Sequence, residues 1–175
     1  MAVTDEILSI AVAVAPQKLC MVPERREEVT TEGGLDVLSN MDKIEKAINK
    51  LDNVGTVCSL FIDPEKEQID AAVKVCAPFV EFHTGRYANA TNEKTIKEEL
   101  NVLTEMASYA DSVGLGVNSG HGLNYNNVAA IAAIPQMNEL NIGHSIIARA
   151  IFTGLPEAVK TMKEIMEKAR NNSQK

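Results

Sequence analysis

The chain has 175 residues, of which 45% are hydrophobic and 23% are charged, and its formal net charge is −7. This length and composition are those of one globular domain with a substantial core, so we expect residues 1–175 to form a single domain. The negative charge argues against a nucleic-acid or anionic-membrane surface, which needs a basic face, although a local group of backbone N–H donors could still bind a phosphate group.

The first part of the chain predicts a helix and then strands that alternate with helices. Thr4 can cap a helix over 5–15, which ends before Pro16, and a short apolar strand follows over 18–22. After a polar loop, the pattern predicts a helix over 41–51 and a strand over 56–62. Asp63 and Pro64 then suit the N-cap and the first position of a helix over 64–75.

The rest of the chain repeats this alternation. The expected strands lie over 78–83, 115–120 and 137–143. A long helix begins at Thr91 or Asn92 and ends near residue 113. Further helices are expected over 126–134, 144–154 and 155–170.

Five strands that each precede a helix indicate parallel βαβ units in an α/β fold. Two architectures fit: a doubly wound open sheet, which five strands would complete, and a (β/α)₈ TIM barrel, which they would not. The chain opens on a helix with no strand ahead of it. We therefore predict an incomplete TIM barrel of about five C-terminal βα units, without the N-terminal strands.

The three cysteines and the N-terminus bear on location. Cys20, Cys58 and Cys76 lie in or beside apolar runs and form no C-x-x-C pair, so we expect buried, reduced thiols and a cytoplasmic protein. The first ten residues carry two acids where a signal peptide needs positive charge, and the apolar stretch over 7–16 is too short to cross a bilayer. No membrane association is expected.

In parallel βα folds, functional residues gather in the loops after the strands. After the first strand, Thr30 and Thr31 precede Gly33 and Gly34, and these residues offer either ligand-binding groups or a plain turn. In the third strand, Glu81 and His83 share one face, where the carboxylate is either functional or part of a structural ion pair with Arg86.

The last two strands end in glycine-flanked histidines. His121 lies between Gly120 and Gly122, and an imidazole at a strand end suits proton transfer near neutral pH. Gly143 and His144 join the last strand to a helix, which predicts an anion site at the helix N-terminus, as after strands 7 and 8 of many barrels. A structural histidine and a simple tight turn are the alternatives.

No cofactor is expected. The three histidines, His83, His121 and His144, lie on different loops, and no H-x-x-x-H or cysteine pair suggests a metal site. The chain also contains neither G-x-G-x-x-G nor G-x-x-x-x-G-K-[ST], so nucleotide binding has no support.

Several segments in collinear order resemble the pyridoxine 5'-phosphate synthase family over essentially the whole chain. They include VPERREEVTTEGGLDV, APFVEFHTGRYA, GLGVNSGHGLNYNNV and MNELNIGHSIIARAIFTGL. The resemblance implies a cofactor-free condensation of 3-amino-2-oxopropyl phosphate with 1-deoxy-D-xylulose 5-phosphate, which forms pyridoxine 5'-phosphate with release of phosphate and water. The partners are small phosphorylated substrates, and the family forms homo-oligomers, octamers among them.

The resemblance also implies roles for individual residues. His121 would be the general acid, and Glu81 would stabilise the transition state. Gly122, Gly143 and His144 would bind the amino-oxopropyl phosphate. Thr30 would contact the deoxyxylulose phosphate.

The family's chain extends upstream of Met1 and carries there a catalytic His and Glu, with arginines that bind phosphate. We therefore expect this sequence to be a fragment or to start at an internal methionine. A truncated, non-catalytic barrel that binds phosphate is the alternative reading. A different phosphate-binding barrel enzyme is a third, which fits poorly because the match extends beyond the phosphate loops.

Overall fold

The computed structural model describes residues 1–24, 28, 30 and 33–173. Within this part of the chain the strands are β1 (Lys18–Met21), β2 (Val57–Ile62), β3 (Phe79–His83), β4 (Gly116–Gly120) and β5 (Met137–Asn141). The larger helices are α1 (Asp5–Val14), α2 (Met41–Asp52), α3 (Lys66–Lys74), α5 (Glu93–Ser112), α7 (His144–Thr153) and α8 (Leu155–Ser173). Short helices are η2 (Leu38–Asn40, 3₁₀), α4 (Gly85–Asn89) and α6 (Val128–Ala132).

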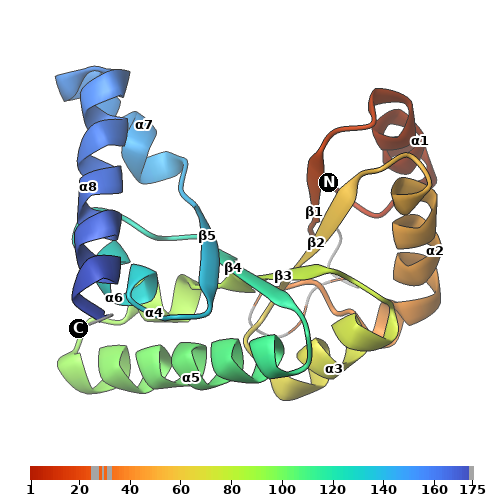
Figure 1. The fold of residues 1–175 in the computed structure, drawn as a ribbon, viewed down its shortest axis with the longest axis horizontal. Helices are drawn as coiled ribbons and strands as arrows, with labels where there is room; N and C mark the ends of the chain where they lie inside the picture. Colours follow the sequence, from red (N-terminus) through yellow and green to blue (C-terminus); the bar gives the residue numbers. More distant parts are fainter. Residues whose placement is uncertain (25–27, 29, 31–32, 174–175) are drawn as a thin grey trace.

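The strands form one parallel sheet in the order β1-β2-β3-β4-β5, which is also their order in the chain. A doubly wound sheet reverses its strand order at a switch point, whereas a barrel adds each strand beside the last. The α/β prediction is therefore confirmed, and the strand order favours the incomplete (β/α)₈ arrangement over the doubly wound sheet. Figure 1 shows the sheet curved like a trough, with the helices on its outer side.

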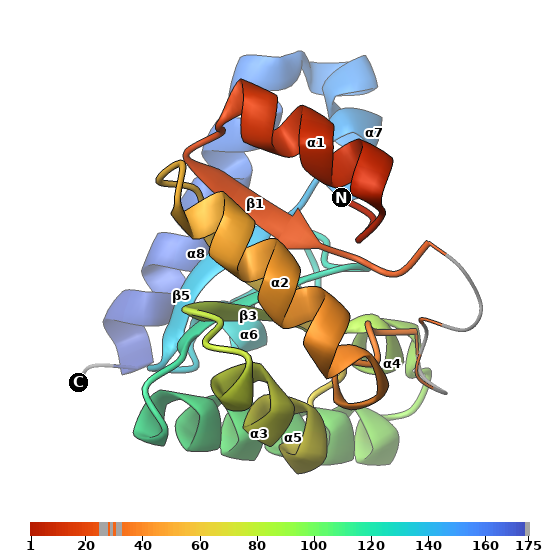
Figure 2. The same cartoon turned by 90° about the vertical axis from the view of Figure 1, so that its right-hand side faces the viewer.

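The two faces of the sheet differ in chemistry. Side chains on the outer face are apolar and almost fully buried, among them Met21, Leu60, Ile62, Val80 and Phe82. Helix α2 places its buried stripe of Ile44, Ala47, Ile48 and Leu51 in the same core, and Figure 2 shows α1 and α2 in front of β1. The inner face instead presents polar groups from neighbouring strands, because alternate residues of a strand point to opposite faces.

Two helix starts follow the sequence prediction. The Thr4 hydroxyl accepts a hydrogen bond from the Ile7 N–H at 3.3 Å, and the Asn92 side chain accepts one from the Thr95 N–H at 2.9 Å. Asn92, and not Thr91, is therefore the N-cap of α5.

The predicted cap of α3 is wrong. The helix begins at Lys66 with Glu65 at the N-cap, two residues beyond the expected position of Asp63. The Asp63 carboxylate accepts hydrogen bonds from the Gly34 N–H and the Thr30 hydroxyl instead, and it lies beside His83. These long-range partners draw the carboxylate away from the backbone of α3.

Other details also differ from the sequence prediction. Cys58 is buried as expected, but Cys20 is half-buried and Cys76 is exposed. Cys76 lies in the turn after α3 at φ 58°, with its N–H bonded to Val73, which turns its side chain outward. Helix α4 was not predicted, since five residues are too few to show helical periodicity. Among the described residues, no helix has the length and apolar character needed to cross a membrane.

Candidate active site

The inner face of the sheet lines a cavity of about 680 Å³. Its wall includes Cys20 from β1, Ser59 and Phe61 from β2, and Glu81 from β3. Asn118 and Asn141 contribute from β4 and β5, and His121 lies at the end of β4. The cavity runs along the inner face of the strands, and His121 lies at the end of β4, where the fold predicts functional residues.

Glu81 is a buried carboxyl group inside this cavity. The Asn141 side-chain amide donates a hydrogen bond to Glu81 Oε2 at 2.7 Å. A β-carbon at Gly120 would lie only 2.4 Å from Glu81 Oε1, so glycine makes room for the carboxyl group. Burial raises the pKa of Glu81 and the charge of Glu139 adds to this, although hydrogen bonds from Asn141 and Cys20 oppose the shift.

The ion pair considered for Glu81 is not what the structure contains. Arg86 Nη2 lies 2.7 Å from Glu99 Oε1, on the outer side of the sheet. The thiol of Cys20 is a hydrogen-bond partner of Glu81, besides the Asn141 amide. Burial and the charge of Glu81 raise the pKa of Cys20 to about 12, so this cysteine is a neutral thiol and not a nucleophile.

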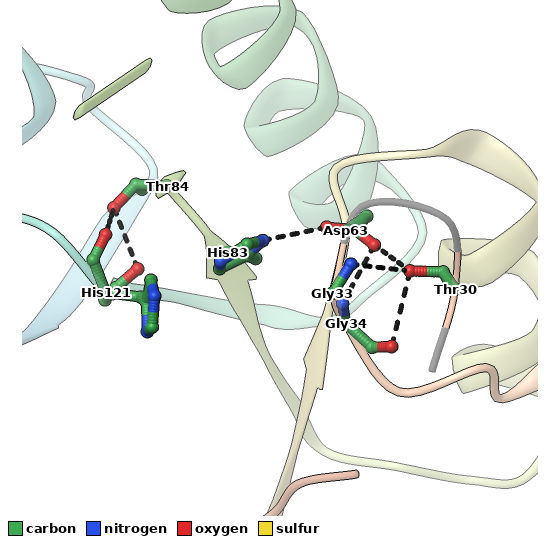
Figure 3. Close-up of polar contacts among 8 residues, drawn as sticks. Thr30, Gly33, Gly34, Asp63, His83, Thr84 and His121 are labelled. Carbon is green, nitrogen blue, oxygen red and sulfur yellow. Dashed lines mark hydrogen bonds and ion pairs between the residues drawn. The ribbon is translucent and has the colours of Figure 1, made fainter. Parts of the chain in front are cut away.

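His121 lies in a strained turn after β4, at the larger cavity. Its φ of 76° lies in the left-handed region, and Gly122 follows at 87°. The Thr84 hydroxyl lies 2.8 Å from the Gly120 carbonyl oxygen and 2.7 Å from that of His121, and these hydrogen bonds hold the turn (Figure 3). Burial and the charge of His83 lower the pKa of His121.

Asp63 and His83 form a second polar cluster beside His121. Asp63 Oδ1 lies 3.1 Å from His83 Nδ1, and Asp63 Oδ2 accepts from the Gly34 N–H at 3.0 Å and from the Thr30 hydroxyl (Figure 3). Burial alone would raise the pKa of Asp63, but the hydrogen bonds from His83, Thr30 and Gly34 outweigh burial and lower it. The rings of His83 and His121 lie 4.7 Å apart.

A smaller cavity of about 490 Å³ lies at the ends of β4 and β5. His121, Gly122, Gly143 and His144 all line it. Gly143 is the N-cap of α7, and the Ser145 hydroxyl donates to the Leu123 carbonyl at 2.9 Å, which joins the two loops. The first N–H groups of a helix have no partner within it, so this end of α7 can accept an anion.

The structure thus brings most of the predicted site residues together. His121, Gly122, Gly143 and His144 share one cavity, Glu81 and His121 share the other, and both cavities include His121 and Asn141. Thr30 lines neither cavity, although Gly33 three residues later lines the larger one. Thr31 lies outside the described residues.

Sequence reasoning missed the contact of Asp63 with His83, beside the larger cavity. An Asp-Pro pair is a common helix start, and that local signal hid the position of Asp63 at the end of a strand. The position itself was the available signal, because polar residues at the ends of parallel strands gather at the functional face.

The larger cavity contains two titratable groups with shifted pKa values. The carboxyl of Glu81 has a raised pKa and the imidazole of His121 a lowered one, so their titration ranges move toward each other inside one cavity. In the described part of the chain, no group of three or more histidine, cysteine or acidic side chains could hold a metal ion.

Known proteins resemble this chain in sequence. A family described as "Pyridoxal phosphate biosynthesis protein PdxJ" matches residues 1–168. A pyridoxine 5'-phosphate synthase of Legionella pneumophila strain Corby is 55% identical over 97% of this chain and 68% of its own length. That of Aliivibrio fischeri is 56% identical over 97% of this chain and 70% of its own length. The chain therefore spans about two thirds of these relatives.

A solved structure resembles the fold. The crystal structure of the Amycolatopsis orientalis BexX/CysO complex contains a chain that matches with a TM-score of 0.64 over 95% of this chain and 60% of its own length. The sequence identity is 12%, so this similarity concerns the fold alone.

Proposed function

The chain belongs to the PdxJ family of pyridoxal phosphate biosynthesis proteins, and from this we propose that it supplies much of the active site of a pyridoxine 5'-phosphate synthase. The enzyme condenses 3-amino-2-oxopropyl phosphate with 1-deoxy-D-xylulose 5-phosphate to form pyridoxine 5'-phosphate, with loss of phosphate and water. These substrates and this reaction are those that the family resemblance implies.

The smaller cavity is the proposed phosphate site. Gly122, Gly143 and His144 bind the phosphate of 3-amino-2-oxopropyl phosphate there. Support comes from the first N–H groups of α7, from the absence of any heavy atom within 4 Å of a β-carbon built at Gly143, and from His144 in the same wall. This gathering of residues from two successive strand ends is the observation that carries the proposal.

His121 and Glu81 are the proposed catalytic residues of the larger cavity. His121 acts as general acid, and a lowered pKa makes its imidazolium form a stronger proton donor. Glu81 stabilises the transition state, and its raised pKa lets it donate a hydrogen bond when protonated. Both groups face the space in which a substrate held at α7 would extend.

Thr30 is the proposed contact to the deoxyxylulose phosphate. Its hydroxyl accepts a hydrogen bond from the Gly33 N–H at 3.3 Å and donates to Asp63, and Gly33 itself lines the larger cavity. A phosphate bound there would replace the Asp63 carboxylate as the hydrogen-bond acceptor of the Thr30 hydroxyl.

We also propose a cytoplasmic homo-oligomer whose partners are small phosphorylated substrates, with neither nucleic acid nor membrane. Support for association comes from the C-terminal part of α7, where Ile151 is 80% exposed and Phe152 is 88% exposed. Such side chains in a row mark an association surface more often than a free surface.

The test is a comparison of the protein with its His121→Asn variant. Formation of pyridoxine 5'-phosphate from the two substrates should fall at least ~100-fold in the variant, as expected for loss of a general acid. Tyr109→Phe, which removes a hydrogen bond to Asp70 far from the cavities, is the matched control and should keep full turnover.

Two results would count against the proposal. Unchanged turnover in the His121 variant would remove His121 from the mechanism. Saturable binding of pyridoxine 5'-phosphate with no turnover by the unsubstituted protein would favour the non-catalytic phosphate-binding reading.

A further inference from the structure

His83 is a buried histidine that the proposed mechanism does not use. Its side chain is 10% exposed, and that of Asp63 beside it is 2% exposed. Asp63 lies 3.1 Å from Nδ1 of His83, and a carboxylate accepts only, so His83 carries a proton on Nδ1. The pair therefore fixes both the tautomer and the orientation of this ring.

The His83 ring is enclosed on its other sides. Phe61 packs against it edge-on with 5.2 Å between ring centroids, and the His121 ring lies 4.7 Å away at 59°. A β-carbon at Gly85 would lie 2.7 Å from His83 Nε2, and one at Gly33 would lie 3.2 Å from Cε1. Two glycines, one in the loop after β1 and one at the start of α4, thus let the backbone approach the ring closely.

Extending the proposed function, on which this step rests, we propose that His83, clamped by Asp63, is a positioning residue that holds the imidazole of His121 at the mouth of the cavity. His121 needs such a support. Its own backbone lies in the left-handed region, which leaves the side chain in a turn between glycines. The packed face of His83 supplies the contact that the glycine neighbours cannot.

The Asp63 carboxylate also contacts the loop after β1. Oδ2 of Asp63 accepts from the Gly34 N–H and the Thr30 hydroxyl, while Oδ1 faces His83. One carboxylate therefore joins the turn proposed to meet the deoxyxylulose phosphate to the ring that supports His121. The side chains of Asp63 and His83 thus form a continuous series of contacts between Thr30 and His121.

Several titratable groups surround His121. His83 and Glu81 lie on β3, and Asp63 follows β2. Lys18 and Cys20 on β1 and Glu139 on β5 line the larger cavity, and His144 lines the smaller one. Among these groups, the charge of His83 is the one that lowers the pKa of His121, after burial itself.

The experiment uses nuclear magnetic resonance of the imidazole nitrogens and carbons. The chain has only three histidines, so single substitutions assign each ring. In the His83→Gln variant, the measured pKa of His121 should rise, because glutamine fills the space without a positive charge. An unchanged His121 titration in a folded His83→Gln protein would overturn the proposal.

A second variant covers the case in which His83→Gln fails to fold. Asp63→Asn keeps the shape of the side chain but removes its charge, and the Nδ1-protonated tautomer of His83 should lose its dominance in the nitrogen shifts. Retention of that tautomer together with an unchanged His121 spectrum would overturn the clamp. Tyr109→Phe should leave both rings as they are.

Enzyme kinetics separate this proposal from the proposed function. If the protein turns over, the alkaline limb of its kcat profile should move to higher pH in His83→Gln, because a general acid stays protonated to higher pH when its pKa rises. Absence of turnover in every variant, with the shifts of His121 observed, would reject the function and keep the positioning role. Normal turnover, with an unchanged pKa of His121 in the variants, would keep the proposed function and reject the positioning role of His83.

Discussion

Two residues that line one cavity, Glu81 and His121, have pKa values that are shifted in opposite directions. Glu81 is buried against Asn141 and favours its neutral form, while His121 beside the charge of His83 favours its neutral form as well. A carboxyl group with a raised pKa and an imidazole with a lowered pKa in one space are suited to proton transfer near neutral pH. This chemistry follows from burial, which the sequence alone did not provide.

The stability of the protein should reflect Glu81. Because its folded-state pKa is raised above the ordinary 4.5, its contribution is fully present below pH 4.5 and is lost as pH rises through the folded value. The Glu81→Gln variant should therefore lose less stability than the unsubstituted protein between pH 4.5 and neutral pH. Urea unfolding at both pH values measures this, with Glu105→Gln on the exposed face of α5 as control; an equal loss in all three proteins would refute it.

The sequence identified His121, Glu81 and the Gly143–His144 pair through strand-end position and family resemblance, and the structure brings them to two adjoining cavities. The sequence alone could not identify the contact between Asp63 and His83. The two residues are 20 positions apart and meet only because β2 and β3 are neighbours in the sheet. Local signals gave Asp63 a different role, that of a helix cap.

At the scale of elements, strong periodicity gave reliable predictions. The boundaries of α2, with its stripe of buried apolar residues, and of α5, with its capping asparagine, agree with the sequence to within a residue or so. Short elements such as α4 carry too few residues for a periodic signal. The order of the strands could not be read from the sequence at all, because both candidate folds share the same alternation.

The cap of α5 allows a matched test. The Asn92 side chain satisfies the Thr95 N–H, so Asn92→Ala should lower the free energy of unfolding by about 1 kcal/mol. Thr91→Ala, one residue earlier and equally exposed, should change it by no more than ~0.5 kcal/mol. Equal effects in thermal or urea unfolding would show that Asn92 is not the cap that matters in solution.

The whole molecule is a curved sheet covered by helices on its outer side, with β1 and β5 at the two edges of the sheet in the described part of the chain (Figure 1). Unpaired strand edges and exposed apolar side chains promote association. The site cavity on the inner face is lined in part by both edge strands, with Cys20 from β1 and Asn141 from β5. The exposed apolar side chains lie apart from it, on α7.

We expect sedimentation velocity to show species larger than the 19.0 kDa monomer. Replacement of Ile151 and Phe152 by serine should shift the distribution toward smaller species, because their exposed apolar side chains on α7 are removed from the contact. A monodisperse monomer that melts cooperatively before any substitution would contradict this expectation.

The most direct test of the account is the site at which a phosphate ester binds. In a titration with pyridoxine 5'-phosphate followed by amide and imidazole resonances, we predict saturable shifts at Gly122, Gly143 and His144, together with a change at the His121 ring. Saturable binding that left these four residues unmoved and shifted resonances elsewhere on the protein would contradict the central claim.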